Sequence, residues 1–407
     1  MYSGIRDRPV AGPKRGAVGL VVVGMGMVSL LTDISSEMVS AVLPIYLTTV
    51  AGLTPLLYGT VSGLYDGVSV AVRLLGGYAA DRLRRPKAVC LAGYGLSAVC
   101  KLGYLGAGSG VGSITGVIAA DRAGKGIRTA PRDAIIAASV APDALGWAFG
   151  VHRAMDTVGA ALGPLAAFGV LLLVPGGFDS VFVVSFGFAV LGLAVLALLV
   201  PDVRPAAAAV RFKLRAVGSR VLWLVFGVAV ALALVTVGDG FLYLILQRAA
   251  GLDVRYFPLL PLVTMLVYLA LAVPFGLLAD RVGRARVFIG GHLLLLGAYA
   301  VALAAPPGIP AVAGTLAMLG AYYAATDGVL AAMAAGLVAE TNRATGIALV
   351  QTGVALGRLV SGVLFGLAWT ATGSASGGLW IFGVGLAVVL PVVGWLFRRS
   401  ELSAKDV

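Results

Sequence analysis

The chain has 407 residues, of which 60% are hydrophobic and only 12% are charged, and its mean hydropathy is +1.00. About a quarter of the residues in an ordinary soluble domain are charged, so this composition excludes a cytosolic enzyme, a disordered chain and a secreted disulfide scaffold. Two cysteines and two histidines are too few for a disulfide framework or a dedicated metal site. We therefore expect a polytopic membrane protein that uses neither a metal nor another cofactor.

Twelve segments of the chain are long and apolar enough to be transmembrane helices. Such a helix needs about 20 predominantly apolar residues. The basic start of the chain leads into a long span rather than a short hydrophobic region, so we expect no cleavable signal peptide. The predicted fold class is an all-α membrane protein. Its spans lie at 17–47, 55–80, 88–107, 112–141, 146–174, 180–200, 221–247, 256–279, 288–305, 310–337, 344–371 and 377–397.

Lysine and arginine are concentrated on one side of this predicted topology. With both termini in the cytoplasm, the cytoplasmic segments carry 20 of the 30 basic residues, whereas the opposite loops carry only Arg248 and Arg255. Cytoplasmic loops of membrane proteins show this bias. We expect a multi-pass protein of the inner (cytoplasmic) membrane. The bias also explains the net charge of +12 without a nucleic-acid partner.

The second half of the chain repeats the first. GGYAADRLRRPK at 76–87 recurs as FGLLADRVGRAR at 275–286, and GAALG at 159–163 recurs as GVALG at 353–357. Two repeated bundles with a binding site at their interface are a recurring plan of transporters. We expect one six-helix bundle at 1–200, a cytoplasmic linker at 201–220 and a second six-helix bundle at 221–407.

The repeated loop resembles the signature loop of the major facilitator superfamily, Gly-x-x-x-Asp-Arg-x-x-Arg. The first copy departs from the family pattern at Arg84 and Pro86, and the second is nearly ideal. Span 5 carries GAALGP, which is similar to the first half of a motif associated with antiporters, although the closing glycine pair is absent. The resemblance implies two pseudo-symmetric bundles and transport by alternating access. The matching loop residues are Gly77, Asp81, Arg82 and Arg85, then Gly276, Asp280, Arg281 and Arg284.

These loops can act as latches. Asp133 and Asp327 occupy corresponding places in spans 4 and 10, where a lone carboxylate within the membrane is costly. We expect Arg85 to pair with Asp133 and Arg284 to pair with Asp327, and these pairs to break when the transporter changes conformation. The alternative is that the loops only set the topology.

Span 4 carries an unusual stripe of charge. Its charged residues recur at helical spacing on one face, so they must avoid lipid. One interpretation is a cationic wall for an anionic substrate group, and the other is a structural network with acids of neighbouring spans. The stripe comprises Asp121, Lys125, Arg128 and Arg132 with Arg122 beside it, and the candidate neighbours are Asp33, Glu37, Asp66, Asp156, Arg73, Arg153 and His152.

Proton coupling requires a carboxylate that is protonated in one state and paired in another. Asp33, Glu37 and Asp156 are candidates by position, and each has an equally plausible structural role. The second half is less charged and suggests a tyrosine-lined wall of the substrate cavity. Its polar residues within the spans are Asp239, Tyr322, Tyr323, Asp327, Gln351 and Arg358, and the glycines around Asp239 predict a helix break.

The sequence therefore favours a proton-coupled secondary transporter that exports a small amphipathic or anionic molecule. An uptake symporter for an organic anion is the first alternative. A membrane-embedded lipid-modifying enzyme is a second, although His152 and His292 show no convincing catalytic partners. No phosphate-binding loop is present to support ATP-driven transport. The expected partners are a small-molecule substrate, protons and the lipid bilayer, and we expect a monomer.

Overall fold

Helices joined by short connections make up the described part of the chain. The computed structural model describes residues 15–65, 67–68, 72, 85–108, 110–141, 144–202, 220–339 and 343–399, and no strand occurs within these ranges. A helix also covers 55–65. The labelled helices are α1 Arg15–Thr49, α3 Pro86–Ala107, α4 Val111–Ala138, α5 Leu145–Leu173, α6 Phe178–Leu198, α7 Arg220–Leu234, α8 Asp239–Ala249, the 3-10 turn η3 Val254–Tyr256, α9 Leu259–Val282, α10 Arg284–Ala304, α11 Ile309–Gly336, α12 Arg343–Thr372 and α13 Ala375–Arg399.

Helices among the described residues coincide with all or part of each of the twelve expected spans. Ten segments of the described chain are long and apolar enough to cross a membrane, with α7 and α8 together forming one of them. α4 is not among the ten, because its charged stripe interrupts the apolar run. The second span is described only at 55–65, 67–68 and 72. The predicted all-α membrane fold is therefore confirmed.

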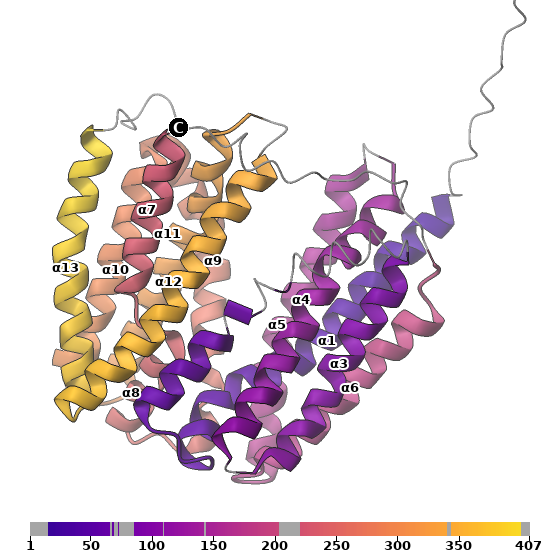
Figure 1. Ribbon diagram of the computed structural model, residues 1–407, viewed down its shortest axis with the longest axis horizontal. Coiled ribbons are helices and arrows are strands. Elements are labelled where there is room, and N and C mark those ends of the chain that lie inside the picture. Colours follow the sequence, from indigo (N-terminus) through magenta and orange to yellow (C-terminus); the bar gives the residue numbers. More distant parts are fainter. Residues whose placement is uncertain are drawn as a thin grey trace, which may run out of the picture.

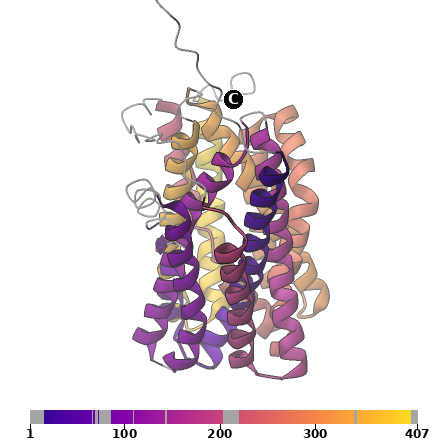
Figure 2. The ribbon, with the colours of Figure 1, turned by 90° about the vertical axis from the view of Figure 1, so that its right-hand side faces the viewer.

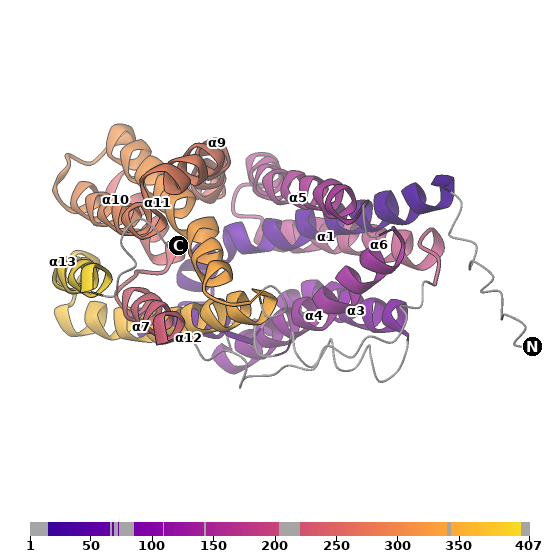
Figure 3. The same cartoon turned by 90° about the horizontal axis from the view of Figure 1, so that it is seen from above.

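The helices form two groups, and their axes all lie roughly along one direction (Figure 2). In the first group α1 packs on α5 and α6, and α3 packs on α4 and α6. In the second group α11 packs on α9 and α10, and α12 packs on α7 and α13. Figures 1 and 3 show the two groups side by side. The predicted division of the chain at 201–220 stays a prediction, since 203–219 lie outside the described residues.

The repeated glycines perform the same task in both groups. A Cβ atom on Gly159 of α5 would lie 2.4 Å from the carbonyl oxygen of Leu30 on α1. A Cβ atom on Gly357 of α12 would lie 2.8 Å from the Cβ of Ala233 on α7. Small residues allow membrane helices to approach closely where larger side chains would clash. The two copies of the repeat thus hold equivalent helix pairs together.

The two groups meet tightly at one end of the molecule. Gly59 of the 55–65 helix crosses Gly362 of α12 so closely that a Cβ atom on Gly59 would lie 2.1 Å from the Gly362 carbonyl oxygen. A Cβ atom on Gly366 would likewise lie 2.6 Å from the carbonyl oxygen of Pro55. Toward the opposite end, where α1 begins and α13 ends, the helices of the two groups diverge (Figure 1). We call the Gly59–Gly362 crossing the glycine seam.

The expected break in the seventh span is confirmed. α7 ends at Leu234 and α8 begins at Asp239. Side chains of neighbouring helices satisfy the backbone groups that the break exposes. The Ser361 hydroxyl donates a hydrogen bond to the carbonyl oxygen of Thr236, and the Val237 N–H donates to the hydroxyl of Tyr299 at 2.8 Å. Non-helical backbone is tolerated at membrane depth only where it is buried in protein or lines a cavity.

The glycine seam predicts that Gly59→Ala opens the end where the groups now meet. The added methyl group clashes with backbone, and overpacking of this kind costs about 1–3 kcal/mol, enough to change the ratio of two conformers by about fivefold or more. The measurement is labelling of a Ser62→Cys variant by an impermeant thiol reagent applied from each side of the membrane. Gly59→Ala should increase labelling from the seam side.

Gly227→Ala is the matched control, because a Cβ atom there meets nothing within 4 Å. Equal labelling in the two glycine variants would contradict a role of the seam in closing the molecule.

Candidate functional site

A cavity of about 440 Å³ lies between the two groups of helices. It is bounded by the 55–65 helix and by α1, α5, α8, α9, α11 and α12, together with the break between α7 and α8. Its charged lining residues are Glu37, Asp239, Asp327 and Arg358. The tyrosines that line it are Tyr58, Tyr65, Tyr243, Tyr268 and Tyr323. Pockets for small molecules commonly occupy about 300–1,000 Å³ and combine an apolar wall with a few polar groups.

The break in the seventh span positions Asp239 in this cavity. Asp239 is the first residue of α8, where the partial positive charge of a helix N-terminus favours a carboxylate. The Tyr323 hydroxyl donates to the carboxylate oxygens at 2.7 and 2.8 Å. The guanidinium carbon of Arg358 lies 5.5 Å from the centre of the Tyr323 ring. Residues of α8, α11 and α12 thus form one polar cluster.

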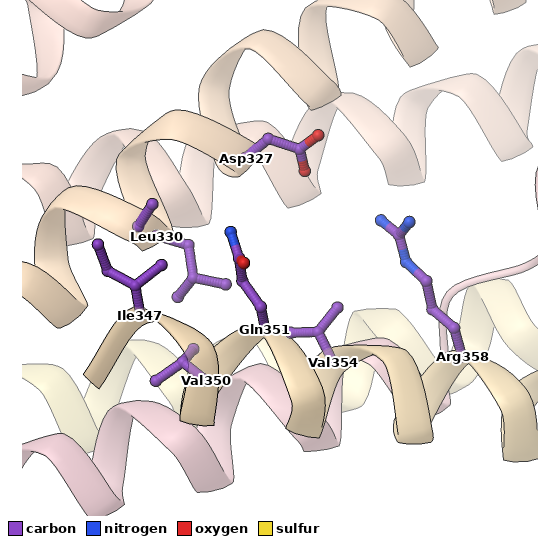
Figure 4. Close-up of a pocket in the computed structure, with 8 residues that line it drawn as sticks. Asp327, Leu330, Ile347, Val350, Gln351, Val354 and Arg358 are labelled. Atoms are coloured by element: carbon purple, nitrogen blue, oxygen red, sulfur yellow. The ribbon is translucent and has the colours of Figure 1, made fainter. Parts of the chain in front are cut away.

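A smaller pocket of about 210 Å³ continues from this cluster between α11 and α12. Figure 4 shows the Asp327 carboxylate and the Arg358 guanidinium facing the same space, which Gln351 of α12 also lines. No ion pair within 4.0 Å joins Asp327 to Arg358 in the described part of the chain. Asp327 therefore presents its charge to the pocket.

The predicted pair of Arg284 with Asp327 is not formed in this conformation, and the latch stays a prediction. Arg284 lies at the start of α10 and its Nη2 is 3.3 Å from Oδ1 of Asp280, one helical turn before it. Its Nη1 donates to the carbonyl oxygen of Ala332 at 3.4 Å. The second loop is still tied to α11, but through a backbone carbonyl instead of a carboxylate.

The charged stripe of α4 is largely neutralised inside the first group of helices. Asp121 accepts from Lys101 Nζ at 3.0 Å, from Arg122 Nη2 at 3.0 Å and from the Ser97 hydroxyl at 2.6 Å. Side chains of Lys101 and Asp121 are only 1% exposed. The Arg122 guanidinium also lies over the ring of Tyr65, 4.0 Å from its centre. This arrangement is the structural network that one interpretation of the stripe predicts.

Two further basic residues of the stripe reach α1. Arg128 is buried, with Nη2 3.9 Å from Oδ1 of Asp33 and its guanidinium 4.2 Å from the centre of the Tyr94 ring. Lys125 Nζ lies 3.5 Å from Oε1 of Glu37, and both side chains are partly exposed. Because Glu37 lines the central cavity, this pair connects the network to the cavity.

The end of the stripe joins α4 to α5. Arg132 contacts Asp133 at 3.0 Å and Asp156 at 3.7 Å. Asp133 is therefore paired with its neighbour in the sequence, and the expected pair with Arg85 is absent. The exposed Arg153 lies 3.3 Å from Asp156, so two arginines flank that carboxylate.

His152 has a polar partner inside the first group of helices. Its Nε2 is 2.7 Å from the Ser29 hydroxyl oxygen. Both residues are buried, and neither lines the two cavities described above. His292 is hydrogen-bonded through Nδ1 to the carbonyl oxygen of Phe288 at 2.9 Å. Neither histidine therefore faces the central cavity.

The predicted substrate residues divide between the two halves. Asp239, Tyr323 and Arg358 line the central cavity, and Gln351 lines the smaller pocket. Tyr322 lines neither and packs against His292. The predicted cationic wall is wrong for this conformation, because its charges meet carboxylates inside the first group; Arg122, Lys125, Arg128 and Arg153 line neither cavity. Five predicted residues lie outside the described residues, namely Asp66, Arg73, Gly77, Asp81 and Arg82.

Sequence reasoning missed Lys101 and four of the cavity tyrosines. Lys101 is the one charged residue within the span at 88–107. A single charge within a membrane span needs a buried partner, so this pattern could have identified Lys101. Nothing in the sequence marks the other four residues as cavity-lining, because aromatic residues are also common in packed helices. They are Tyr58, Tyr65, Tyr243 and Tyr268. Within the described ranges, no group of three His, Cys, Asp or Glu side chains could hold a metal ion.

The Asp121 network predicts an order of stability among variants. Asp121→Asn leaves two buried cations without a counterion, whereas Lys101→Met leaves the Asp121–Arg122 pair in place. Removing the acid from a buried ion pair costs about 3–5 kcal/mol. The fraction of protein that stays monodisperse after heating in detergent should fall further for Asp121→Asn than for Lys101→Met. The reverse order would show that Asp121 does not hold the network together.

Comparisons with known proteins agree with this architecture. The model of the Major Facilitator Superfamily matches residues 25–266 and 228–407. An uncharacterised MFS-type transporter of Methanocaldococcus jannaschii is 30% identical over 354 residues, which cover 85% of this chain and 87% of that protein.

Two solved structures share the fold at low sequence identity. The nucleoside transporter NupG is 13% identical with a TM-score of 0.76, and the match covers 93% of this chain and 99% of that chain. A bacterial homologue of the human lysosomal transporter Spinster, in an inward-facing and unoccupied conformation, is 14% identical with a TM-score of 0.73 and coverage of 97% and 99%. On the evidence of the family match across both halves, this chain belongs to the major facilitator superfamily.

Proposed function

We propose that this protein is a proton-coupled secondary transporter that exports a small amphipathic molecule by alternating access. The observation that carries the proposal is the central cavity, to which both groups of helices contribute. At one end the glycine seam holds the groups together, and toward the other end they diverge (Figure 1). A rocking motion about such a cavity exposes it to each side in turn.

The orientation follows from the positive-inside bias. We place both termini in the cytoplasm and the protein, as a monomer, in the inner membrane. The diverging end is then cytoplasmic, and the conformation described here is open toward the cytoplasm. A substrate would enter from that side, and outward release would require the glycine seam to open. The signature loops would latch the cytoplasmic ends once they approach each other.

Proton coupling is assigned to the first group of helices. Asp33 lies beside Arg128, and Asp156 lies beside Arg132. Protonation of either acid removes a counter-charge from a neighbouring arginine, which then favours a different set of partners. The Glu37–Lys125 pair would transmit this change to the cavity.

The alternatives fare less well. The argument for an uptake symporter of organic anions rested on unpaired basic residues of α4. These residues are paired with acids, so they do not offer a site for an anion. A lipid-modifying enzyme would need a catalytic group in a cavity, and the Ser29–His152 pair lines neither cavity described. Relatives in the superfamily also indicate a transporter rather than an enzyme.

The experiment is flux in proteoliposomes of defined orientation, using radiolabelled amphipathic compounds that differ in charge. We expect at least one compound to move outward from the cytoplasmic side, driven by an imposed pH gradient, and a protonophore to abolish that movement. Asp33→Asn and Asp156→Asn should lose gradient-driven flux by about tenfold or more, because each removes a titrating acid.

Asp253→Asn is the control, since Asp253 is half-exposed in the loop before η3 and pairs with Arg255 at 3.0 Å. Flux that survives the protonophore, or flux that both acid variants retain, would contradict proton coupling. Product formation without flux would support an enzyme instead.

A further inference from the structure

The lining of the central cavity carries more acid than base. Three carboxylates, Glu37, Asp239 and Asp327, face it together with one arginine, Arg358. Glu37 is paired with Lys125 on α4, which does not line the cavity. The second group of helices therefore contributes two carboxylates and one guanidinium to the charge of the cavity lining. A cation entering this space meets net attraction, and an anion meets net repulsion.

The two carboxylates, Asp239 and Asp327, differ in the partners that they have within the protein. Asp239 receives the Tyr323 hydroxyl and lies at the N-terminus of α8. Asp327 has no hydrogen-bond or ion-pair partner among the described residues, and its side chain points into the pocket in Figure 4. Asp327 also belongs to the lining of both the large cavity and the smaller pocket. It is the acid that is free to take a ligand's charge.

The remaining lining suits an apolar or aromatic cation. Tyr58, Tyr65 and Tyr268 come from the 55–65 helix and α9, so tyrosines face the cavity from both halves. The faces of aromatic rings attract cations, by about 0.5–2 kcal/mol depending on desolvation. Most of the remaining lining is apolar and includes Leu43, Pro44, Leu47, Val61, Pro261 and Met265.

Arg358 does not reverse this preference. Its guanidinium is directed over the Tyr323 ring at 5.5 Å and lies in the same pocket as the Asp327 carboxylate. One guanidinium offsets only one of the two carboxylates on this side of the cavity, Asp239 and Asp327. The basic residues that would attract an anion are inside the first group, where Asp121 and Asp33 take up the charges of Lys101, Arg122 and Arg128.

We infer that the ligand of the central cavity is an amphipathic organic cation, whose charge is held by Asp327 and whose apolar body packs against the tyrosines. This inference rests on the proposed function and narrows its substrate class. It assigns Asp327 to ligand binding and leaves the proton to the acids of the first group.

The test uses two probes of the same size and shape but of opposite charge, tetraphenylphosphonium and tetraphenylborate. Equilibrium binding of each radiolabelled ion is measured on the purified full chain in detergent. We expect saturable binding of tetraphenylphosphonium and at least about tenfold weaker binding of tetraphenylborate. Asp327→Asn should weaken tetraphenylphosphonium binding by about tenfold or more, since it removes the charge that the cation faces. Asp253→Asn should leave the binding unchanged.

A complementary variant guards against loss of folding. Arg358→Gln removes the competing positive charge and should tighten tetraphenylphosphonium binding, a gain that a misfolded protein cannot show. Absence of saturable binding to the wild-type protein, equal or tighter binding of tetraphenylborate, or unchanged affinity in Asp327→Asn would overturn the inference.

The outcome is separable from that of the proposed function. Proton-driven flux of a neutral or anionic compound, without cation binding, would keep the transporter and remove the cation site. Saturable cation binding that depends on Asp327, without any proton-driven flux, would keep the site and remove the proposed transport.

Discussion

A charged side chain cannot face hydrocarbon without a large cost in free energy, and this constraint organises the whole first half of the molecule. α4 carries acids and bases that no lipid-facing helix could hold, and the fold places them against α1, α3 and α5. Asp121 is the centre of the most deeply buried part, where one carboxylate takes two cations and a hydroxyl. Farther along α4, successive bases meet acids of α1 and α5.

The second half solves the same problem with fewer charges. A break between α7 and α8 lets Asp239 lie at a helix terminus, where Tyr323 of α11 donates a hydrogen bond to it. The result is a division of labour between the halves. The first contains a dense network of ion pairs, whereas the second contains a sparse cluster in which Asp327 lines the pocket. Glu37 on α1 belongs to both regions, because it pairs with Lys125 of the network and also lines the central cavity.

Much of the fold was predictable because it depends on local properties. Apolar stretches of sufficient length defined the spans, and the glycines around Asp239 identified the break. The repeated GAALG and GVALG segments foretold equivalent helix contacts, which Gly159 and Gly357 now form. Small residues and long apolar runs keep their meaning wherever the helix finally packs.

The pairing of charges was less predictable because it depends on which helix faces which. The spacing of Lys125 and Arg128 showed that they share a face of α4, but not that this face meets α1 instead of the cavity. The repeat, in which Arg284 corresponds to Arg85 and Asp327 to Asp133, suggested that Arg284 would reach Asp327, yet Asp280 lies closer, one helical turn before Arg284. Lys101 stands alone in its span, and only the three-dimensional arrangement reveals Asp121 as its partner.

The central claim is that the two halves rock about the cavity so that its ends open in turn. The most direct test measures distances between pairs of spin labels by pulsed electron paramagnetic resonance. One pair is at Leu173 and Ile309 and the other at Leu198 and Leu278. All four side chains are exposed, and each pair joins one half of the molecule to the other. We expect that lowering the pH or adding a ligand changes the two distances in opposite directions. Distances that stay fixed, or that lengthen and shorten together at both ends, would contradict alternating access in this protein.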